Sequence, residues 1–230
     1  MGYQFDWFVL WEYRHVLWDG FCLTMVLFFW GTLFSLGASL LLGVVGASRH
    51  WVPARAVDLY VEFNRNTPLV VKMFFLYFAF SFDAFTAAVA ALALHQSAYM
   101  AEVVRAGIQT IARGQIEAGL SSGFTRRAVM SRIVLPQALM IIIPPMTTQI
   151  LEVLKNTSIA MTISVEEVTF QTQQIEALTF RGFEAATAGT IAYLLVGLMV
   201  AGAAIKLEQV LQLRVGITSR RGKSALVPRL

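Results

Sequence analysis

The segment Gly20–Ser48 reads GFCLTMVLFFWGTLFSLGASLLLGVVGAS and contains no charged residue. An α-helix needs about 20 apolar residues to cross the hydrocarbon layer, so this segment is long enough to span a membrane with some tilt. Small side chains recur in it every four residues and form one stripe, which lets two helix backbones approach closely in lipid. The stripe consists of Gly31, Ser35, Ser39, Gly43 and Ala47. The segment therefore predicts an all-α membrane protein.

The composition of the whole chain agrees with this prediction. Of its 230 residues, 57% are hydrophobic and 14% are charged, whereas soluble domains carry about 25% charged residues. A disordered chain would be rich in charge and poor in aromatic residues. The single cysteine, Cys22, cannot form an intrachain disulfide bond. Soluble, disordered and disulfide-stabilised proteins are thus excluded.

Four further segments are apolar enough to cross a membrane, at about residues 57–82, 85–104, 139–163 and 185–205. Pro68 interrupts the first of them, and Pro144-Pro145 interrupts the third. Both interrupted segments also carry charged residues, which would not face lipid. We therefore expect five transmembrane helices, of which the second and fourth are broken and lie against protein or an aqueous cavity.

The distribution of Lys and Arg predicts the orientation. If the N-terminus is outside, 13 of the 18 basic residues lie in cytoplasmic segments and two in external segments. Because cytoplasmic loops carry the excess of positive charge, we expect an external N-terminus and a cytoplasmic C-terminus. Residues 1–19 are then an interfacial segment rich in Trp, residues 20–212 are the transmembrane domain, and residues 213–230 are a cytoplasmic tail. The sequence at 226–229, LVPR, resembles the remnant of an expression tag.

Several kinds of chemistry lack their sequence motifs. The chain has no Gly-x-x-x-x-Gly-Lys-[Ser/Thr] loop, no His-Glu-x-x-His pair and no Gly-x-Ser-x-Gly turn. We therefore predict no catalytic residues, no metal site and no cofactor. Arginines beside transmembrane segments indicate topology and lipid contact rather than nucleic-acid binding. Two other classes stay open at this point, a membrane-embedded enzyme and a passive channel.

The cytoplasmic segment at about residues 105–136 carries a spaced pattern. It reads Glu117-Ala118-Gly119, then Gly123 after three residues, and Ile133 and Leu135-Pro136 after nine more. We expect a short amphipathic helix that ends near Gly123, with Arg126 and Arg127 behind it. The pattern resembles the EAA loop of ATP-binding-cassette (ABC) importer permeases, with Gly119 in place of the usual alanine. An ABC permease contacts its ATPase through this loop.

Three other stretches resemble permeases of the polar amino acid uptake family. They are VEFNRNTPL at 61–69, AYMAEVVRAGI at 98–108 and LKNTS at 154–158. The resemblance implies the type I ABC importer permease fold in a bacterial inner membrane, and ATP hydrolysis on a partner chain. The implied partners are a cytoplasmic ATPase dimer, a second permease subunit (identical or different) and an extracytoplasmic amino-acid-binding protein. An acidic or amide amino acid is the expected substrate, with a basic one equally allowed.

Two sets of candidate residues follow. The ATPase-coupling set is Glu117, Ala118, Gly119, Gly123, Arg126, Arg127, Ile133, Leu135 and Pro136. The substrate-pathway set is Glu62, Arg65, Asn66, Thr67, Pro68, Glu152, Lys155, Asn156, Thr157 and Ser158. Acid–base pairs at i, i+3 stand out along the helices: Glu62 with Arg65, Glu102 with Arg105, and Glu152 with Lys155. Such pairs can offer both charges to a zwitterion, or they can simply neutralise each other.

Overall fold

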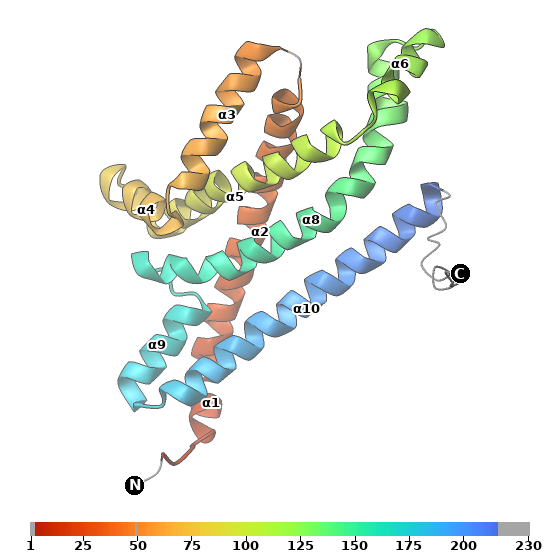
Figure 1. Cartoon of the computed structure of the whole chain (residues 1–230). Helices are drawn as coiled ribbons and strands as arrows, with labels where there is room; N and C mark the ends of the chain where they lie inside the picture. Colours follow the sequence, from red (N-terminus) through yellow and green to blue (C-terminus); the bar gives the residue numbers. More distant parts are fainter. Residues whose placement is uncertain (1–2, 49, 216–230) are drawn as a thin grey trace, which may run out of the picture.

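The computed structural model describes residues 3–48 and 50–215, and these residues form helices joined by short turns, without a strand (Figure 1). The all-α prediction is confirmed. The predicted tag remnant lies outside the described residues. In chain order the elements are α1 (Phe8–Glu12), α2 (Arg14–Gly46), α3 (Trp51–Asn66), α4 (Leu69–Phe74), the π-helix η1 (Phe75–Ala79), α5 (Ala84–Gln109), α6 (Arg113–Ser121), α7 (Arg126–Val129), the π-helix η2 (Met130–Val134), α8 (Leu135–Asn156), the 3₁₀-helix η3 (Thr157–Ile163), α9 (Val168–Thr179) and α10 (Gly182–Val215).

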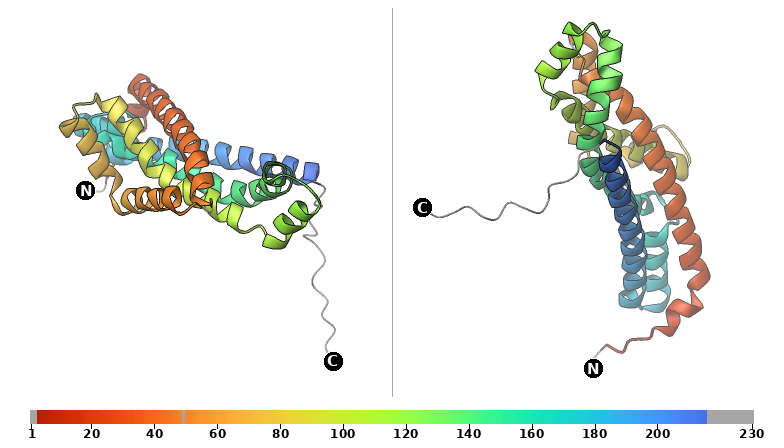
Figure 2. Two further views of the ribbon diagram at one scale, coloured as in Figure 1. Left: turned by 90° about the horizontal axis from the view of Figure 1, so that it is seen from above. Right: turned by 90° about the vertical axis from the view of Figure 1, so that its right-hand side faces the viewer.

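The molecule is elongated, with α2, α8 and α10 running along much of its length (Figures 1 and 2). The N-terminal segment, α1 and α9 lie at one end. Helix α6 lies at the opposite end (Figure 1). The segment predicted to contact an ATPase and the N-terminal segment predicted to be external are therefore at opposite ends of the molecule's long axis.

Helices α2 and α5 pack closely along the predicted stripe of small residues. Gly31, Ser35, Ser39 and Gly43 are all buried. A Cβ atom added to Gly43 would lie 2.5 Å from Cβ of Val104 on α5. The stripe thus allows the close approach that its spacing indicates.

Four helical segments among the described residues are long and apolar enough to cross a membrane: 14–46, 84–109, 126–163 and 182–210. The predicted span 57–82 is not a continuous helix, because α3 ends at Asn66 and α4 begins at Leu69 on either side of Pro68. Its first half, α3, is too polar to count as a span, and only the short segment Leu69–Ala79 is apolar. The length and hydropathy of the described helices therefore identify four of the five predicted spans.

The predicted interruption of the fourth span at Pro144-Pro145 is wrong. Helix α8 runs through both prolines from Leu135 to Asn156. The irregular hydrogen bonding lies at its two ends, in the π-helix η2 before it and the 3₁₀-helix η3 after it. Neighbouring helices α5 and α10 pack along α8, and such packing can hold a helix together where proline removes backbone hydrogen bonds.

Two buried carboxylates hold the end of the molecule that contains α9. Glu184 accepts hydrogen bonds from the Tyr3 hydroxyl and the Asp6 backbone N–H, which ties the N-terminal segment to α10. Glu167 caps α9 through the backbone N–H groups of residues 169 and 170, and it accepts the Tyr193 hydroxyl of α10 at 2.7 Å. Burial raises the pKa of the Glu167 carboxyl, although these donors favour its charged form.

Candidate functional site

A polar hollow lies between α3 and α5 and has a volume of about 630 Å³. Its walls carry five ionisable side chains, together with a tyrosine and an asparagine. It is lined by Asp58, Val61, Glu62, Arg65, Asn66, Tyr99, Glu102 and Arg105. A space of this size and polarity can hold an amino acid. We call it the α3–α5 cavity.

The charged residues of the α3–α5 cavity pair across the two helices and not along them. Arg65 lies 2.8 Å from the Glu102 carboxylate, and Arg105 lies 2.5 Å from the Asp58 carboxylate. The predicted pairs Glu62/Arg65 and Glu102/Arg105 are therefore wrong. Because α3 packs directly against α5, each arginine meets a carboxylate of the facing helix. The Arg65 guanidinium also lies 5.2 Å from the centre of the Tyr99 ring.

Glu62 is left without a basic partner. Among the described residues, no Lys, Arg or His nitrogen lies within 4.0 Å of its carboxylate, and its side chain is exposed. The cavity walls thus carry three acidic and two basic side chains, with both bases already paired. Glu62 is available to bind an ammonium group.

Lys72 is a functional candidate that the sequence reasoning missed. It lies on α4 with only 7% of its surface exposed, and its ammonium donates a hydrogen bond to the backbone carbonyl of Asn64. The Lys72 Nζ and His95 Nδ1 atoms are 3.0 Å apart. A lysine within an apolar run was the available signal, since an ionisable residue at membrane depth indicates function by default.

The second half of the predicted pathway lies elsewhere. Glu152 and Lys155 form an ion pair on α8 at 2.7 Å, as predicted, and their side chains are 41% and 66% exposed. Neither residue lines the α3–α5 cavity. Thr157 is buried and bonds the Leu154 carbonyl, while Ser158 bonds the Lys155 carbonyl. Asn66 borders the cavity, whereas Thr67 caps the end of α3 through the Phe63 carbonyl.

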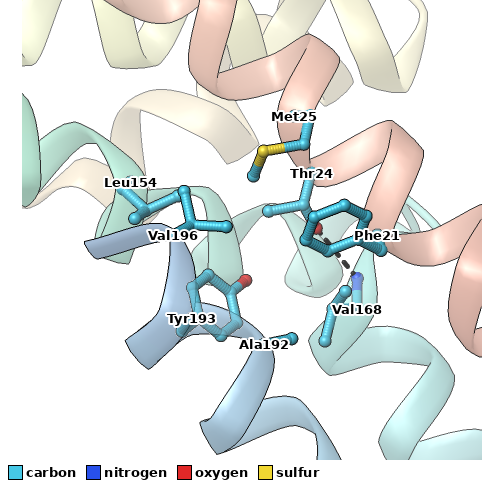
Figure 3. Close-up of a pocket in the computed structure, with 8 residues that line it drawn as sticks. All are labelled: Phe21, Thr24, Met25, Leu154, Val168, Ala192, Tyr193 and Val196. Atoms are coloured by element: carbon cyan, nitrogen blue, oxygen red, sulfur yellow. Dashed lines mark hydrogen bonds between the residues drawn. The ribbon is translucent and has the colours of Figure 1, made fainter. Parts of the chain in front are cut away.

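A second pocket, among α2, α8, α9 and α10, has no space for a ligand (Figure 3). Apart from Thr24 and Tyr193, apolar side chains line it, and its volume accessible to a water-sized molecule is about 0 Å³. The Val168 backbone N–H donates to the Thr24 hydroxyl at 3.1 Å, which joins α9 to α2 (Figure 3). This pocket is a packing contact between helices and not a ligand-binding site.

The predicted coupling segment forms a compact helical hairpin. Helix α6 carries Glu117 and Ala118 on its exposed surface and turns the buried Gly119 toward α7 and η2. A Cβ atom at position 119 would lie 2.8 Å from Cδ1 of Ile133, so glycine allows a closer approach than alanine. After α6 the chain turns at Gly123, whose φ of +83° is in the left-handed region that favours glycine.

The remaining members of the coupling set lie on the other arm of this hairpin. Arg126 and Arg127 begin α7 and are exposed, as is Leu135 at the start of α8, while Ile133 and Pro136 are partly buried. The hairpin thus exposes the charged side chains of Glu117, Arg126 and Arg127. Its two arms are held together by a small apolar contact at Gly119.

Comparison with known proteins places these features in context. Residues 39–209 match the family model described as "Binding-protein-dependent transport system inner membrane component". The chain is 37% identical over 201 residues to the "Probable amino-acid ABC transporter permease protein PatM" of Vibrio harveyi, covering 84% of this chain and 89% of that protein. It is 33% identical over 213 residues to the "Glutamine transport system permease protein GlnP" of Escherichia coli (strain K12), covering 90% and 97%.

Solved structures of amino acid ABC transporters are also similar to this chain. A chain of the "Crystal structure of an amino acid ABC transporter with histidines" superposes with a TM-score of 0.83 at 29% identity, covering 90% of this chain and 99% of that one. A chain of the MetNI methionine ABC transporter in an inward-facing conformation has a TM-score of 0.69 at 17% identity, covering 88% and 97%, and it supports the fold alone.

Proposed function

The chain belongs to the family of binding-protein-dependent transport system inner membrane components, and we propose that its cargo crosses the membrane along the α3–α5 cavity. The chain is the permease subunit of an ABC importer for amino acids and a multi-pass protein of the bacterial inner membrane. It is a transport subunit and not an enzyme, since the ATPase of such systems is a separate subunit. An importer permease of this kind works with that ATPase, with a substrate-binding protein and with a second permease.

We propose five membrane crossings with the N-terminus outside. Four are the long apolar helices, and the fifth is the broken segment of α3, α4 and η1. Its polar half, α3, packs against α5, and the charged side chains on this side line the cavity between the two helices instead of facing lipid. The excess of basic residues in the segments assigned to the cytoplasm supports this orientation.

We propose that the α6–α7 hairpin contacts the ATPase. A lever between two proteins needs a rigid shape, and Gly119 and Gly123 fix the two arms of this hairpin relative to each other. Replacing Gly123 with valine forces a β-branched residue into the left-handed region. We expect Gly123→Val to retain membrane insertion but to reduce amino-acid-stimulated ATPase activity of the assembled importer at least tenfold.

The control for this prediction is Gly114→Val on the neighbouring helix α6, where an added side chain meets no atom within 4 Å and the backbone is helical. Cross-linking from residues 115–126 to the ATPase measures the contact directly. Cross-links that place this segment away from the ATPase would falsify the assignment.

The observation that best supports the proposed pathway is the unpaired Glu62 carboxylate in a cavity whose other charges are paired. Glu62 is suited to bind the ammonium group of the cargo, and Asn66, which lines the same cavity, is suited to bind the polar side chain of the cargo.

The Glu152–Lys155 pair is half-exposed on a membrane helix, and exposing such charges to lipid is costly. We propose that this face of α8, with Asn156, Thr157 and Ser158, is covered by the second permease subunit and borders the same passage.

The cargo that these features favour is a polar amino acid. The glutamine permease GlnP is a relative along nearly its whole length, and amide, acidic and basic amino acids all carry the ammonium group that Glu62 would bind. We propose an amide amino acid as the first substrate to assay.

Replacing Glu62 with glutamine tests the pathway. A charge-assisted hydrogen bond contributes about 1.5–3 kcal/mol, so we expect KM for ATP-driven uptake to rise about tenfold or more. The assay uses proteoliposomes with the assembled importer and its binding protein, and the L-amino acid that the wild type takes up fastest. Glu12→Gln, at an exposed carboxylate on α1, is the matched control.

If Glu62→Gln keeps the wild-type KM and substrate preference, the cavity is not the pathway. Uptake that continues without ATP would instead favour a passive channel.

A further inference from the structure

The N-terminal helical segment, α1 and the start of α2, has one side against the protein and one side exposed. On its inner side, Val9 packs with Ile175 of α9 and Ala185 of α10. On its outer side, Trp11 and Trp18 are each 63% exposed. Tryptophan is enriched where a membrane protein meets the lipid headgroups. The outer side is thus an aromatic surface that the described residues leave uncovered.

Several contacts fix this segment to the start of α10. The Tyr3 hydroxyl and the Asp6 backbone N–H both donate to the buried carboxylate of Glu184. The rings of Phe5 and Phe183 pack edge to face, with their centres 5.2 Å apart. The exposed tryptophans therefore have a defined position relative to the membrane helices.

Arg14 lies between the two exposed tryptophans. The Cζ atom of its guanidinium is 4.6 Å from the centre of the Trp11 ring, and its Nη1 donates to the Trp11 backbone carbonyl at 2.7 Å. Trp18 follows four residues later on α2, which places it on the same side of that helix as Arg14. We call these three side chains the Trp11–Arg14–Trp18 cluster.

The positive charge of Arg14 has no counter-charge in the part of the chain that the structure describes. Within residues 3–48 and 50–215, no carboxylate oxygen lies within 4.0 Å of its guanidinium. The bond to the Trp11 carbonyl is the one hydrogen bond that this guanidinium donates there. Its other N–H groups form a planar fork, whose geometry matches the oxygens of a phosphate group. The cluster therefore offers an exposed anion-binding group between two indole rings.

The position of the cluster along α2 corresponds to the headgroup layer. The uncharged run of α2 begins at Gly20, two residues after Trp18. At a rise of 1.5 Å per residue, Arg14 is about 6 Å farther out along the helix axis than Trp18. The headgroup layer on each side of a bilayer is about 5–7 Å thick. Trp18 thus lies near the edge of the hydrocarbon and Arg14 near the level of the phosphates.

The exposed side of α2 continues from the cluster into the hydrocarbon layer. Exposed side chains recur along it every three or four residues, at Trp18, Cys22, Val26, Phe29 and Leu33. An apolar stripe of this kind on a membrane helix is suited to acyl chains. A lipid whose chains lie along this stripe would place its headgroup at Arg14.

We propose that the Trp11–Arg14–Trp18 cluster binds the headgroup of a phospholipid. The Arg14 guanidinium binds the phosphate, the two indole rings flank the headgroup, and the acyl chains lie along α2 toward Cys22. The contacts with Glu184 hold this lipid site at a fixed height on the permease. The site is separate from the α3–α5 cavity, so the proposal does not depend on the proposed pathway.

Photo-cross-linking identifies what occupies this face. The assembled importer carries Cys22→p-benzoylphenylalanine, one turn beyond Trp18, and is reconstituted in vesicles of phosphatidylethanolamine and phosphatidylglycerol. Each sample contains a trace of one tritiated lipid at equal mole fraction: phosphatidylglycerol, phosphatidylethanolamine or diacylglycerol. Diacylglycerol keeps the acyl chains but lacks the phosphate. We expect both phospholipids to label the permease about tenfold more than diacylglycerol does, because only they can form charge-assisted hydrogen bonds with Arg14.

Three variants in the same background assign the preference to Arg14. Arg14→Gln should lower the phospholipid labelling to the level of diacylglycerol and leave the diacylglycerol labelling unchanged. Its amide can still donate to the Trp11 carbonyl, and the position is exposed, so we expect this variant to assemble. Arg14→Lys keeps the charge and should keep most of the preference. Arg55→Gln removes an exposed arginine of α3 and should behave as the wild type.

Each other outcome would overturn the proposal. Cross-linking of position 22 to another polypeptide would show that a protein covers this face. Equal labelling by all three lipids in the wild-type chain would show apolar contact without a phosphate site, and this comparison needs no variant. An unchanged ratio in Arg14→Gln would exclude Arg14 as the phosphate ligand. Equal loss of labelling by all three lipids in Arg14→Gln would show that Arg14 only maintains the local structure.

Discussion

Proline occurs in two membrane helices of this chain, and the helices respond differently. At Pro68 the preceding residue, Thr67, has extended backbone angles (φ −99°, ψ 124°), and α3 ends there. At Pro144 and Pro145 the helix α8 continues for eleven more residues, to Asn156. Both sites leave backbone carbonyls without their usual N–H partners. Proline by itself therefore does not decide whether a membrane helix breaks.

The difference lies in what surrounds each site. After Pro68 the chain changes direction, α4 packs against α5 and η3, and the Lys72 ammonium bonds the carbonyl that Pro68 leaves free. Around Pro144 and Pro145, α8 keeps its neighbours α5 and α10 along its length. No side chain of the described residues donates to the carbonyl of Met140 or Ile141, the positions four residues before the two prolines. A charged cap thus accompanies the broken helix, and helix packing accompanies the continuous one.

The largest expected effect is on the broken helix. Lys72→Met leaves the buried Asn64 carbonyl without a donor, which costs about 1–3 kcal/mol. Pro68→Ala restores an N–H at the position that such a carbonyl normally bonds. We therefore expect Lys72→Met to lower the stability of the assembled complex markedly, and Pro68→Ala/Lys72→Met to recover at least half of the loss. Thermal unfolding of the four members of this double-mutant cycle measures it. Strictly additive effects would show that Lys72 does not replace the missing N–H.

A smaller effect is expected at the continuous helix. Pro145→Ala offers an N–H to the Ile141 carbonyl without changing the course of α8, so we expect stability to stay within about 1 kcal/mol of the wild type or to rise. The same thermal unfolding assay applies, with ATP-driven uptake as a second measurement. A large loss of uptake with unchanged stability would indicate that a bend at Pro144-Pro145 is itself required for transport.

The smallest effect is expected where a helix end is capped locally. The Asp83 carboxylate accepts the Thr86 backbone N–H at 3.0 Å and caps α5. Hydrogen bonds from the Thr86 side chain and from this backbone N–H lower the pKa of the Asp83 carboxyl. A lowered pKa in the folded state stabilises the protein above the unfolded-state pKa, and the contribution is lost as the pH falls through the folded-state value. Asp83→Asn should therefore lower the unfolding temperature slightly at pH 7, and the difference should shrink below pH 4. A difference that persists in acid would mean that the charge of Asp83 is not what stabilises the cap.

The sequence by itself determined the helical class, four of the five predicted membrane segments and the short helix α6 that ends just before Gly123. These features depend on local properties: the length of apolar runs, the four-residue spacing of small side chains between Gly31 and Gly43, and the glycine that turns the chain at position 123. The Glu152–Lys155 pair was also predictable, because both residues lie on one turn of one helix.

Only the tertiary structure decided the pairing at the candidate site. Arg65 and Glu102 are 37 positions apart in sequence, and Asp58 and Arg105 are 47 apart. Their contacts depend on how α3 lies against α5. Whether a helix breaks at proline likewise depends on the packing and donors around it, as Pro68 and Pro145 show. The unpaired charges of Glu62 and Lys72 become visible only after the other charges have found partners, because a side chain can be recognised as unpartnered only when every helix near it is in place.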